Sequence, residues 1–154
     1  GHLEAYASAT GVTKRAHEAL AAGRASSLMR RVAASEALSP LMISEEAIAG
    51  DALSRELVFD TAAYLGIGIT TLMHTVDPGA VILGGAMTFG GHGTPLGEDF
   101  LERIRAEVRR RAFPVLAEKT TIDFAALGSD AGFIGAAGIA RAGLRKSAEP
   151  LCPS

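Results

Sequence analysis

Paired glycines that follow a strand-like apolar run are the first feature of this 154-residue chain that could take part in chemistry. The run 80–83 leads into Gly84, Gly85 and Ala86, which open a glycine-rich loop ending at residue 93. Glycines let a ligand approach the backbone closely, and α/β proteins bind ligands at the carboxyl edge of the sheet. The local pattern leaves two interpretations open, ligand contact or a tight turn after a strand. Neither a Walker A loop nor Gly-x-Gly-x-x-Gly spacing occurs there.

The carboxylate of Glu4 is a second candidate, on the first turn of the opening predicted helix. The helix dipole favours an acidic residue there, and this structural explanation is sufficient by itself. A functional carboxylate would instead accept hydrogen bonds from a polyhydroxylated substrate, because its two oxygens are acceptors. Taken alone, the position favours the structural explanation.

Four histidines, His2, His17, His74 and His92, complete the candidate set. No two of them have the spacing of metal ligands, so a complete metal site is not encoded. We expect His17 on a solvated helix face and His74 near a helix end, where a cation is favoured. His92 lies in the glycine-rich loop, where it either contacts a ligand or is solvated.

Alternating helices and strands are predicted to position these residues, with helices at 3–22, 25–38, 44 onward, 51–76, 98–111 and 131–143, and strands at 80–83 and 120–127. The helix over 51–76 has the strongest apolar periodicity, with Leu72 and Val76 on its inward face and Gly66 and Gly68 at a close contact. The order of elements indicates an α/β fold with helices packed on a sheet. A stable sheet usually needs three or more strands, so we expect further strands outside this chain.

Composition excludes several classes of protein. Hydrophobic residues make up 48% and charged residues 21%, which argues against disorder. The net charge of −2 supplies no overall attraction to nucleic acid or anionic membrane. The single cysteine, Cys152, excludes an intrachain disulfide and favours a reducing, cytoplasmic location. No apolar run reaches the ~20 residues of a membrane span. Because the chain starts at Gly1, without a methionine and inside a helical pattern, we expect a fragment.

The ordered combination of motifs resembles the ROK family of sugar kinases and repressors over nearly the whole chain. Residues 1–8, Gly-His-Leu-Glu-Ala-Tyr-Ala-Ser, resemble the segment that follows the zinc motif of that family. Further matches follow in the family's order at 50–52, 65–68, 77–78, 81–85, 128–131 and 135–137. Within the family, the bacterial glucokinases are closest in character.

The resemblance implies the carboxyl-terminal lobe of an actin-like (ribonuclease H-like) ATPase fold, helix-rich with a small sheet, over residues 1–144. Residues 145–154 would form a flexible tail. The implied reaction is phosphoryl transfer from MgATP to a hexose hydroxyl, most simply of glucose. Glu4 would then bind sugar hydroxyls, and Gly84, Gly85 and Ala86 would lie against the adenosine part of ATP. His2 stands where the family has the last of three zinc-binding cysteines, and histidine is also a competent zinc ligand.

Several motifs of the family are absent from this sequence: the Asp-x-Gly-Gly-Thr phosphate loop, the Asn-Asp pair with the catalytic Asp, Glu-x-Gly-His and Cys-x-Cys-Gly. In the family they all precede a segment like residues 1–4. We therefore expect no catalytic residue in this chain, no activity without the missing amino-terminal lobe, and a homo-oligomer with no membrane partner. The alternative is the sugar-sensing body of a ROK repressor, the one case with a nucleic-acid partner. A stand-alone binding module is a third hypothesis, which the start inside a motif disfavours.

Overall fold

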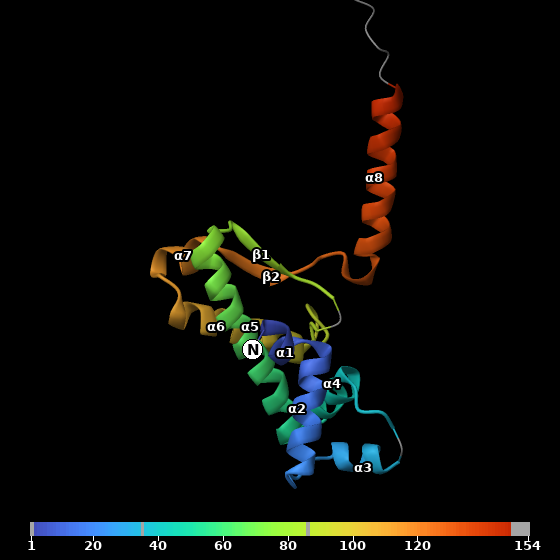
Figure 1. Cartoon of the computed structure of the whole chain (residues 1–154), viewed down its shortest axis with the longest axis vertical. Helices are drawn as coiled ribbons and strands as arrows, with labels where there is room; N and C mark the ends of the chain where they lie inside the picture. The colour runs from blue at the N-terminus through green and yellow to red at the C-terminus, as the bar shows by residue number, and fades with distance from the viewer. Residues whose placement is uncertain (1, 35, 86, 149–154) are drawn as a thin grey trace, which may run out of the picture. The chain divides into compact units, whose positions relative to one another are not determined.

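The computed structural model describes residues 2–34, 36–85 and 87–148 and divides the chain into two units, Gly1–Phe124 and Ala125–Ser154 (Figure 1). The first unit contains α1 (Leu3–Ala7), α2 (Ala9–Ala21), α3 (Leu28–Ala33), α4 (Pro40–Ile48), α5 (Ala52–Val76), β1 (Ala80–Leu83), α6 (Pro95–Arg111), α7 (Pro114–Lys119) and β2 (Thr121–Phe124). The second unit contains a 3₁₀ turn, η1 (Gly128–Asp130), and α8 (Ala131–Ala148). The expected helix-rich α/β architecture with a small sheet is confirmed.

Helix α5 forms the centre of the first unit and confirms the strongest sequence prediction. It contacts α1, α2, α4 and α6. Its buried side has ten residues, Leu53, Ser54, Leu57, Val58, Thr61, Ala62, Gly66, Ile69, Thr70 and Met73. Helix α5 is also long and apolar enough to cross a membrane by length and composition, a property that core helices of globular proteins share. Its extensive packing makes it the core helix of this unit.

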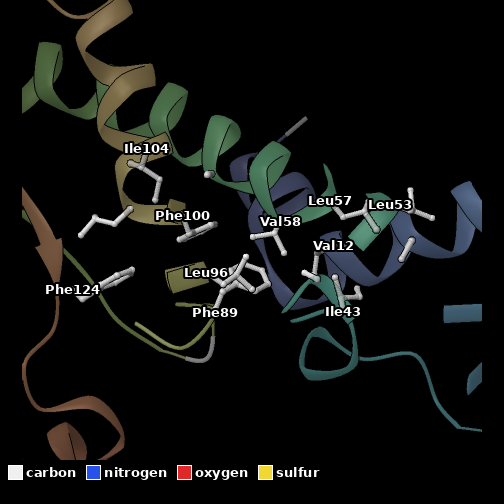
Figure 2. Close-up of a cluster of buried hydrophobic side chains, with 14 of the residues drawn as sticks. Val12, Ile43, Leu53, Leu57, Val58, Phe89, Leu96, Phe100, Ile104 and Phe124 are labelled. Carbon is white, nitrogen blue, oxygen red and sulfur yellow. The ribbon is translucent and has the colours of Figure 1, made fainter. Parts of the chain in front are cut away.

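The prediction for the carboxyl-terminal end of α5 was wrong, because Leu72 and Val76 are 52% and 66% exposed. The first half of the helix packs on α2 and α4, and Val12, Ile43 and Leu57 belong to the same buried cluster (Figure 2). In the second half, a Cβ on Gly66 would come within 2.6 Å of the Glu107 Cβ in α6. The buried face turns around the helix axis because the packing partners change. The predicted close contact at Gly66 is confirmed.

The opening helix is broken at Ser8, although a single helix over 3–22 was predicted. Ser8 has extended backbone angles (φ −113°, ψ 170°), and its Oγ accepts the Gly11 N–H at 3.1 Å. Gly11 is helical, although glycine is unfavourable in the interior of a helix. A Cβ on Gly11 would lie 2.7 Å from the carbonyl oxygen of Ala5. The glycine is therefore needed because α1 folds back against the first turn of α2.

Two predictions between residues 25 and 48 were also wrong. Among the described residues of the predicted stretch 25–38, only α3 is helical. Helix α4 begins at Pro40 rather than at residue 44, because Ser39 Oγ accepts the Met42 N–H at 3.2 Å. Proline after a helical stretch can mark its end, but a capping serine followed by proline at the first helical position is a helix start signal.

The two strands pair in parallel, with Ala80 opposite Thr121 and Leu83 opposite Phe124. Both strands were predicted, but β2 is shorter than the stretch 120–127, and α7 before it was not expected. The continuous apolar run 80–83 predicts a strand buried on both faces, and this is wrong for the part of the chain that the structure describes, since Ile82 is 58% exposed. Among the described residues β1 pairs only with β2, so its other edge has no partner strand, and Ile82 lies on a face that no described residue covers.

Helix α6 connects the strands and packs on α5 and β2. The apolar positions of the 98–111 pattern predict its inward face, and all four are buried, namely Phe100, Leu101, Ile104 and Val108. The amphipathic pattern of 98–111 predicts Arg105 on the outward face, but it is partly buried and donates from Nε and Nη2 to the Ile122 carbonyl oxygen at 3.0 and 2.7 Å. This arginine therefore fastens α6 to β2.

The second unit begins after Phe124 and consists of η1 and α8. The expected helix at 131–143 is confirmed but extends further, to Ala148. Residues 145–148, predicted as the start of a flexible tail, are helical, and this Arg-Lys-Ser-Ala stretch contains neither the glycine nor the proline that would end a helix. Residues 149–154, including Cys152, lie outside the described residues.

Asp51 caps α5, and its removal should destabilise the first unit. Its carboxylate accepts hydrogen bonds from Ser54 N–H (2.8 Å), Ser26 Oγ (2.9 Å) and Ser27 N–H (2.9 Å). Burial is the largest single influence and disfavours the ionised form, but these bonds together lower the pKa of Asp51. We expect Asp51→Ala to reduce the free energy of unfolding by about 2 kcal/mol at neutral pH, measured by urea denaturation.

The contribution of Asp51 to the free energy of unfolding should decrease at acidic pH. Because the folded-state pKa is below the unfolded one, the stabilisation is complete above the ordinary aspartate pKa and is lost as the pH falls through the folded value. The difference between parent and Asp51→Ala should therefore shrink below about pH 4. Asp51→Asn keeps an acceptor and serves as the control with a smaller loss. Equal stability of parent and Asp51→Ala at pH 7 would contradict the capping role.

Candidate functional site

A pocket of about 320 Å³ brings together two segments that are far apart in the sequence. One wall is the junction of α1 and α2, and the opposite wall is the chain that leaves β1. The lining residues are Ala7, Ser8, Ala9, Leu65, Leu83, Gly84, Gly85, Met87 and Phe100. The predicted glycine pair therefore lies at a pocket rather than only at a turn.

The glycine pair leaves the backbone bare at the pocket, and both residues are exposed. Gly85 has φ +86°, which disfavours any residue with a side chain. No heavy atom lies within 4 Å of a Cβ built on Gly85, so the backbone conformation and not crowding within the described residues requires glycine. Ala86, the third predicted cofactor residue, lies outside the described residues. The space beside Gly85 is therefore open to a ligand.

Glu4 lies on α1, which ends at the pocket wall, but Glu4 itself does not line the pocket. The side chain is exposed and has no hydrogen-bond or ion-pair partner among the described residues. Both carboxylate oxygens are therefore available to a ligand. Glu4 and the glycine pair belong to the same unit. Ala7, at the end of the helix that carries Glu4, lines the same pocket as Gly84.

The position of α1 is set by contacts with α5 and α2. Leu3 packs where Gly68 has no side chain, as predicted for a close helix contact, and the rings of Tyr6 and Tyr64 lie 5.1 Å apart. Arg15 donates from Nη2 to the Tyr6 carbonyl oxygen at 3.2 Å and to Thr61 Oγ1. The segment that carries Glu4 is thus fastened to the core helix.

Arg15 is largely buried, and its guanidinium also lies over the Tyr64 ring at 5.3 Å. Burial lowers the pKa of Arg15, while Asp60, 3.9 Å away, and Tyr64 oppose the shift. A planar cation with several donors can join a carbonyl, a hydroxyl and a ring at once. No local feature of the sequence around Arg15 indicates this role, because its partners Thr61 and Tyr64 are far away in the sequence.

His2 occupies the cap position of α1 and is exposed, without a capping hydrogen bond from its side chain. A structural zinc site needs four ligands, and the described residues contain no group of three or more His, Cys, Asp or Glu side chains that could hold a metal ion. This chain could therefore contribute one ligand from His2, and the zinc role of that residue stays a prediction.

His92 is held between two carboxylates, which neither sequence interpretation of this residue foresaw. Its Nδ1 lies 2.9 Å from Glu98 Oε1 and its Nε2 lies 2.8 Å from Asp123 Oδ1. Glu98, and then Asp123, raise the pKa of His92. In return His92 lowers the pKa of Glu98, and the Phe124 N–H followed by His92 lowers that of Asp123. No local signal could reveal this cluster, because Asp123 is far away in the sequence.

Comparison with known proteins gives consistent matches. The ROK family model matches residues 1–142. A glucokinase of Halalkalibacterium halodurans is 30% identical over 135 residues, which cover 88% of this chain and 39% of that protein. The structure of a ROK family glucokinase from Streptomyces griseus, in complex with glucose and AMPPNP, is similar with a TM-score of 0.67 and 27% identity, covering 92% of this chain and 45% of that one.

A regulator shares the fold as well. The structure of a ROK family transcriptional regulator, a homologue of the E. coli MLC protein, is similar with a TM-score of 0.65 and 23% identity, over 80% of this chain and 29% of that one. The chain thus spans less than half the length of each of these three relatives.

Proposed function

Because this chain belongs to the ROK family and has the carboxyl-terminal lobe of its actin-like ATPase fold, we propose that it serves in an ATP-dependent hexose kinase with glucose as the acceptor. The observation that supports this most directly is the similarity, over 92% of the chain, to a glucokinase that binds glucose and AMPPNP. The pocket between the α1–α2 junction and the glycine pair is consistent with a ligand at this place.

In this proposal the described residues bind and orient the substrates. Glu4 accepts hydrogen bonds from sugar hydroxyls, since an ionised carboxylate is an acceptor at both oxygens. Gly84 and Gly85 let the adenosine part of ATP approach the backbone of the chain that leaves β1. Phosphoryl transfer depends mainly on positioning and on neutralising phosphate charge, to which Mg²⁺ contributes when ATP binds. We assign the proton-accepting group to the amino-terminal lobe and not to this chain.

The proposal predicts glucose phosphorylation by the full-length protein. ADP release should depend on both glucose and MgATP, measured in a coupled assay against a panel of hexoses and amino sugars. Heat-treated protein and reactions without sugar are the controls. A full-length protein that turns over no sugar would defeat the kinase proposal.

The second candidate is the sugar-binding body of a transcriptional regulator, which the structural similarity to such a regulator supports at the level of the fold. The bare glycine pair favours the kinase, because a sensor needs no nucleotide site, whereas a sugar-binding Glu4 fits both candidates. A full-length protein that binds sugar and a specific DNA sequence, without turnover, would favour the regulator.

A further inference from the structure

The residues after the glycine pair form a loop whose far end returns to the sheet. We define the glycine loop as residues 84–93. We propose that His92 is a positioning residue for the nucleotide, because it ties the end of this loop to β2 and α6 and thereby sets where Gly84 and Gly85 lie. This inference rests on the proposed function, in which the glycine pair receives ATP.

Both ring nitrogens of His92 face carboxylate oxygens, at 2.9 Å to Glu98 and 2.8 Å to Asp123. Ionised carboxylates only accept hydrogen bonds, so both nitrogens must donate, and only the imidazolium form has two N–H groups. The ring also meets the Phe124 ring edge-on, with centroids 5.2 Å apart. The contacts therefore select the charged form of His92 in one orientation.

These contacts hold the end of the glycine loop close to the strand from which the loop begins. Asp123 pairs across the sheet with Ile82, which lies two residues before Gly84. The chain thus leaves β1 at the glycine pair and returns through His92 to the neighbouring strand. Glu98 lies in the first turn of α6, the helix that also contributes Phe100 to the pocket. His92 thus connects the glycine loop to β2 and to α6.

The same cluster makes the attachment sensitive to pH. The charged groups facing His92 are Glu98 on α6 and Asp123 on β2, and Arg105 on α6 lies 3.6 Å from the Asp123 carboxylate. When His92 loses its proton, Asp123 still has Arg105 and the Phe124 N–H as partners. Because the pKa of His92 is raised, the attachment is complete below the ordinary histidine pKa and is lost as the pH rises through the raised value. The glycine loop should therefore loosen at alkaline pH.

The test measures nucleotide binding by the full-length protein at about pH 6 and about pH 9 by calorimetry with AMPPNP. His92→Gln removes the cation, whereas His92→Arg keeps a permanent cation with a forked set of donors. We expect the dissociation constant of the parent to rise about fivefold between the two pH values. After correction for the pH dependence of the nucleotide itself, His92→Gln should bind AMPPNP weakly at both pH values. His92→Arg should bind it tightly at both pH values.

Two further measurements separate positioning from other roles. The kcat of His92→Gln at saturating ATP should equal that of the parent, with the change confined to the ATP KM. Amide exchange of residues 84–93 at one acidic pH, without nucleotide, should be several-fold faster in His92→Gln. His17→Gln, an exposed histidine on α2, is the matched control and should behave as the parent does.

The outcomes distinguish this inference from the proposed function. A parent that binds no nucleotide at either pH rejects the function, and amide exchange then decides the role of His92 alone. Unchanged exchange in His92→Gln overturns the inference. A nucleotide dissociation constant that follows the parent's pH profile in His92→Gln overturns it as well, even if the variant melts at a lower temperature.

Discussion

Gly97→Ala is expected to lower the free energy of unfolding of the first unit by about 3 kcal/mol. Gly97 lies in the first turn of α6, where a Cβ would come within 2.7 Å of the Gly91 nitrogen and closer still to its carbonyl oxygen. Both are backbone atoms of the glycine loop, so no side-chain rotation can relieve the overlap. The loop or the helix would have to shift.

The sign of the Gly97→Ala effect makes it diagnostic. In an open helix, replacing glycine by alanine stabilises by about 0.5–1 kcal/mol, because alanine loses less conformational freedom on folding. Here the first turn is wrapped by the loop, since Thr94 Oγ1 accepts the Gly97 N–H at 3.1 Å and lies 3.3 Å from the Phe89 and Gly91 carbonyl oxygens. Phe89 is itself buried against Phe100, with ring centroids 4.8 Å apart.

Urea denaturation followed by circular dichroism at neutral pH measures the effect of Gly97→Ala. Gly79→Ala is the matched control, because no heavy atom lies within 4 Å of a Cβ there and the residue does not have a left-handed φ. The control should be within about 0.5 kcal/mol of the parent. A Gly97→Ala protein as stable as the control would show that the loop does not press against α6 in solution.

The second large effect is expected at Glu4, whose replacement by glutamine in the full-length protein should raise the sugar KM. A hydrogen bond to a charged group contributes about 1.5–3 kcal/mol, which corresponds to roughly 10–100-fold in affinity. Glutamine keeps the length of the side chain but has one acceptor oxygen in place of two and no charge. The ATP KM should stay unchanged, because Glu4 does not line the pocket of the glycine pair.

Steady-state kinetics with glucose varied at saturating MgATP checks the Glu4→Gln prediction. The matched control is Glu18→Gln on α2, where the carboxylate is exposed and lies 3.8 Å from Lys14 in an i,i+4 pair. Surface pairs of this kind contribute little, so sugar kinetics should not change. A Glu4→Gln enzyme with the sugar KM of the parent would remove Glu4 from the proposed sugar site.

Elements with local signals were predicted well. The start of α5 follows from Asp51, and its end follows from Asp77, which caps the helix in the left-handed conformation before Pro78. The short strand β1 and the buried face of α6 likewise follow from runs and periods within single segments. The predictions failed where contacts with a segment distant in the sequence determine the local structure. The break at Ser8 and the turning face of α5 depend on which helices pack there, and α3 is shorter than its alanine-rich sequence suggests.

In the candidate site, too, some features follow from local sequence patterns and others only from tertiary contacts. The glycine pair after β1 could be singled out from the sequence, because a strand followed by glycines is a local pattern. Glu4 was indistinguishable from an ordinary first-turn acid until the family resemblance was considered. That the α1–α2 junction faces Gly84 and Gly85 across one pocket could not be predicted, because no local signal joins residues 7–9 to residues 83–87.

From the sequence alone, therefore, came the α/β class, the central helix, the two strands and the identity of the glycine pair. These are properties of helix caps, apolar periods and backbone freedom, which act over a few neighbouring residues. The tertiary structure alone decided that Arg15 fastens the Glu4 segment and that His92 reaches Asp123. Such contacts depend on how helices cross and how strands align, and these are set by the packing of the whole unit.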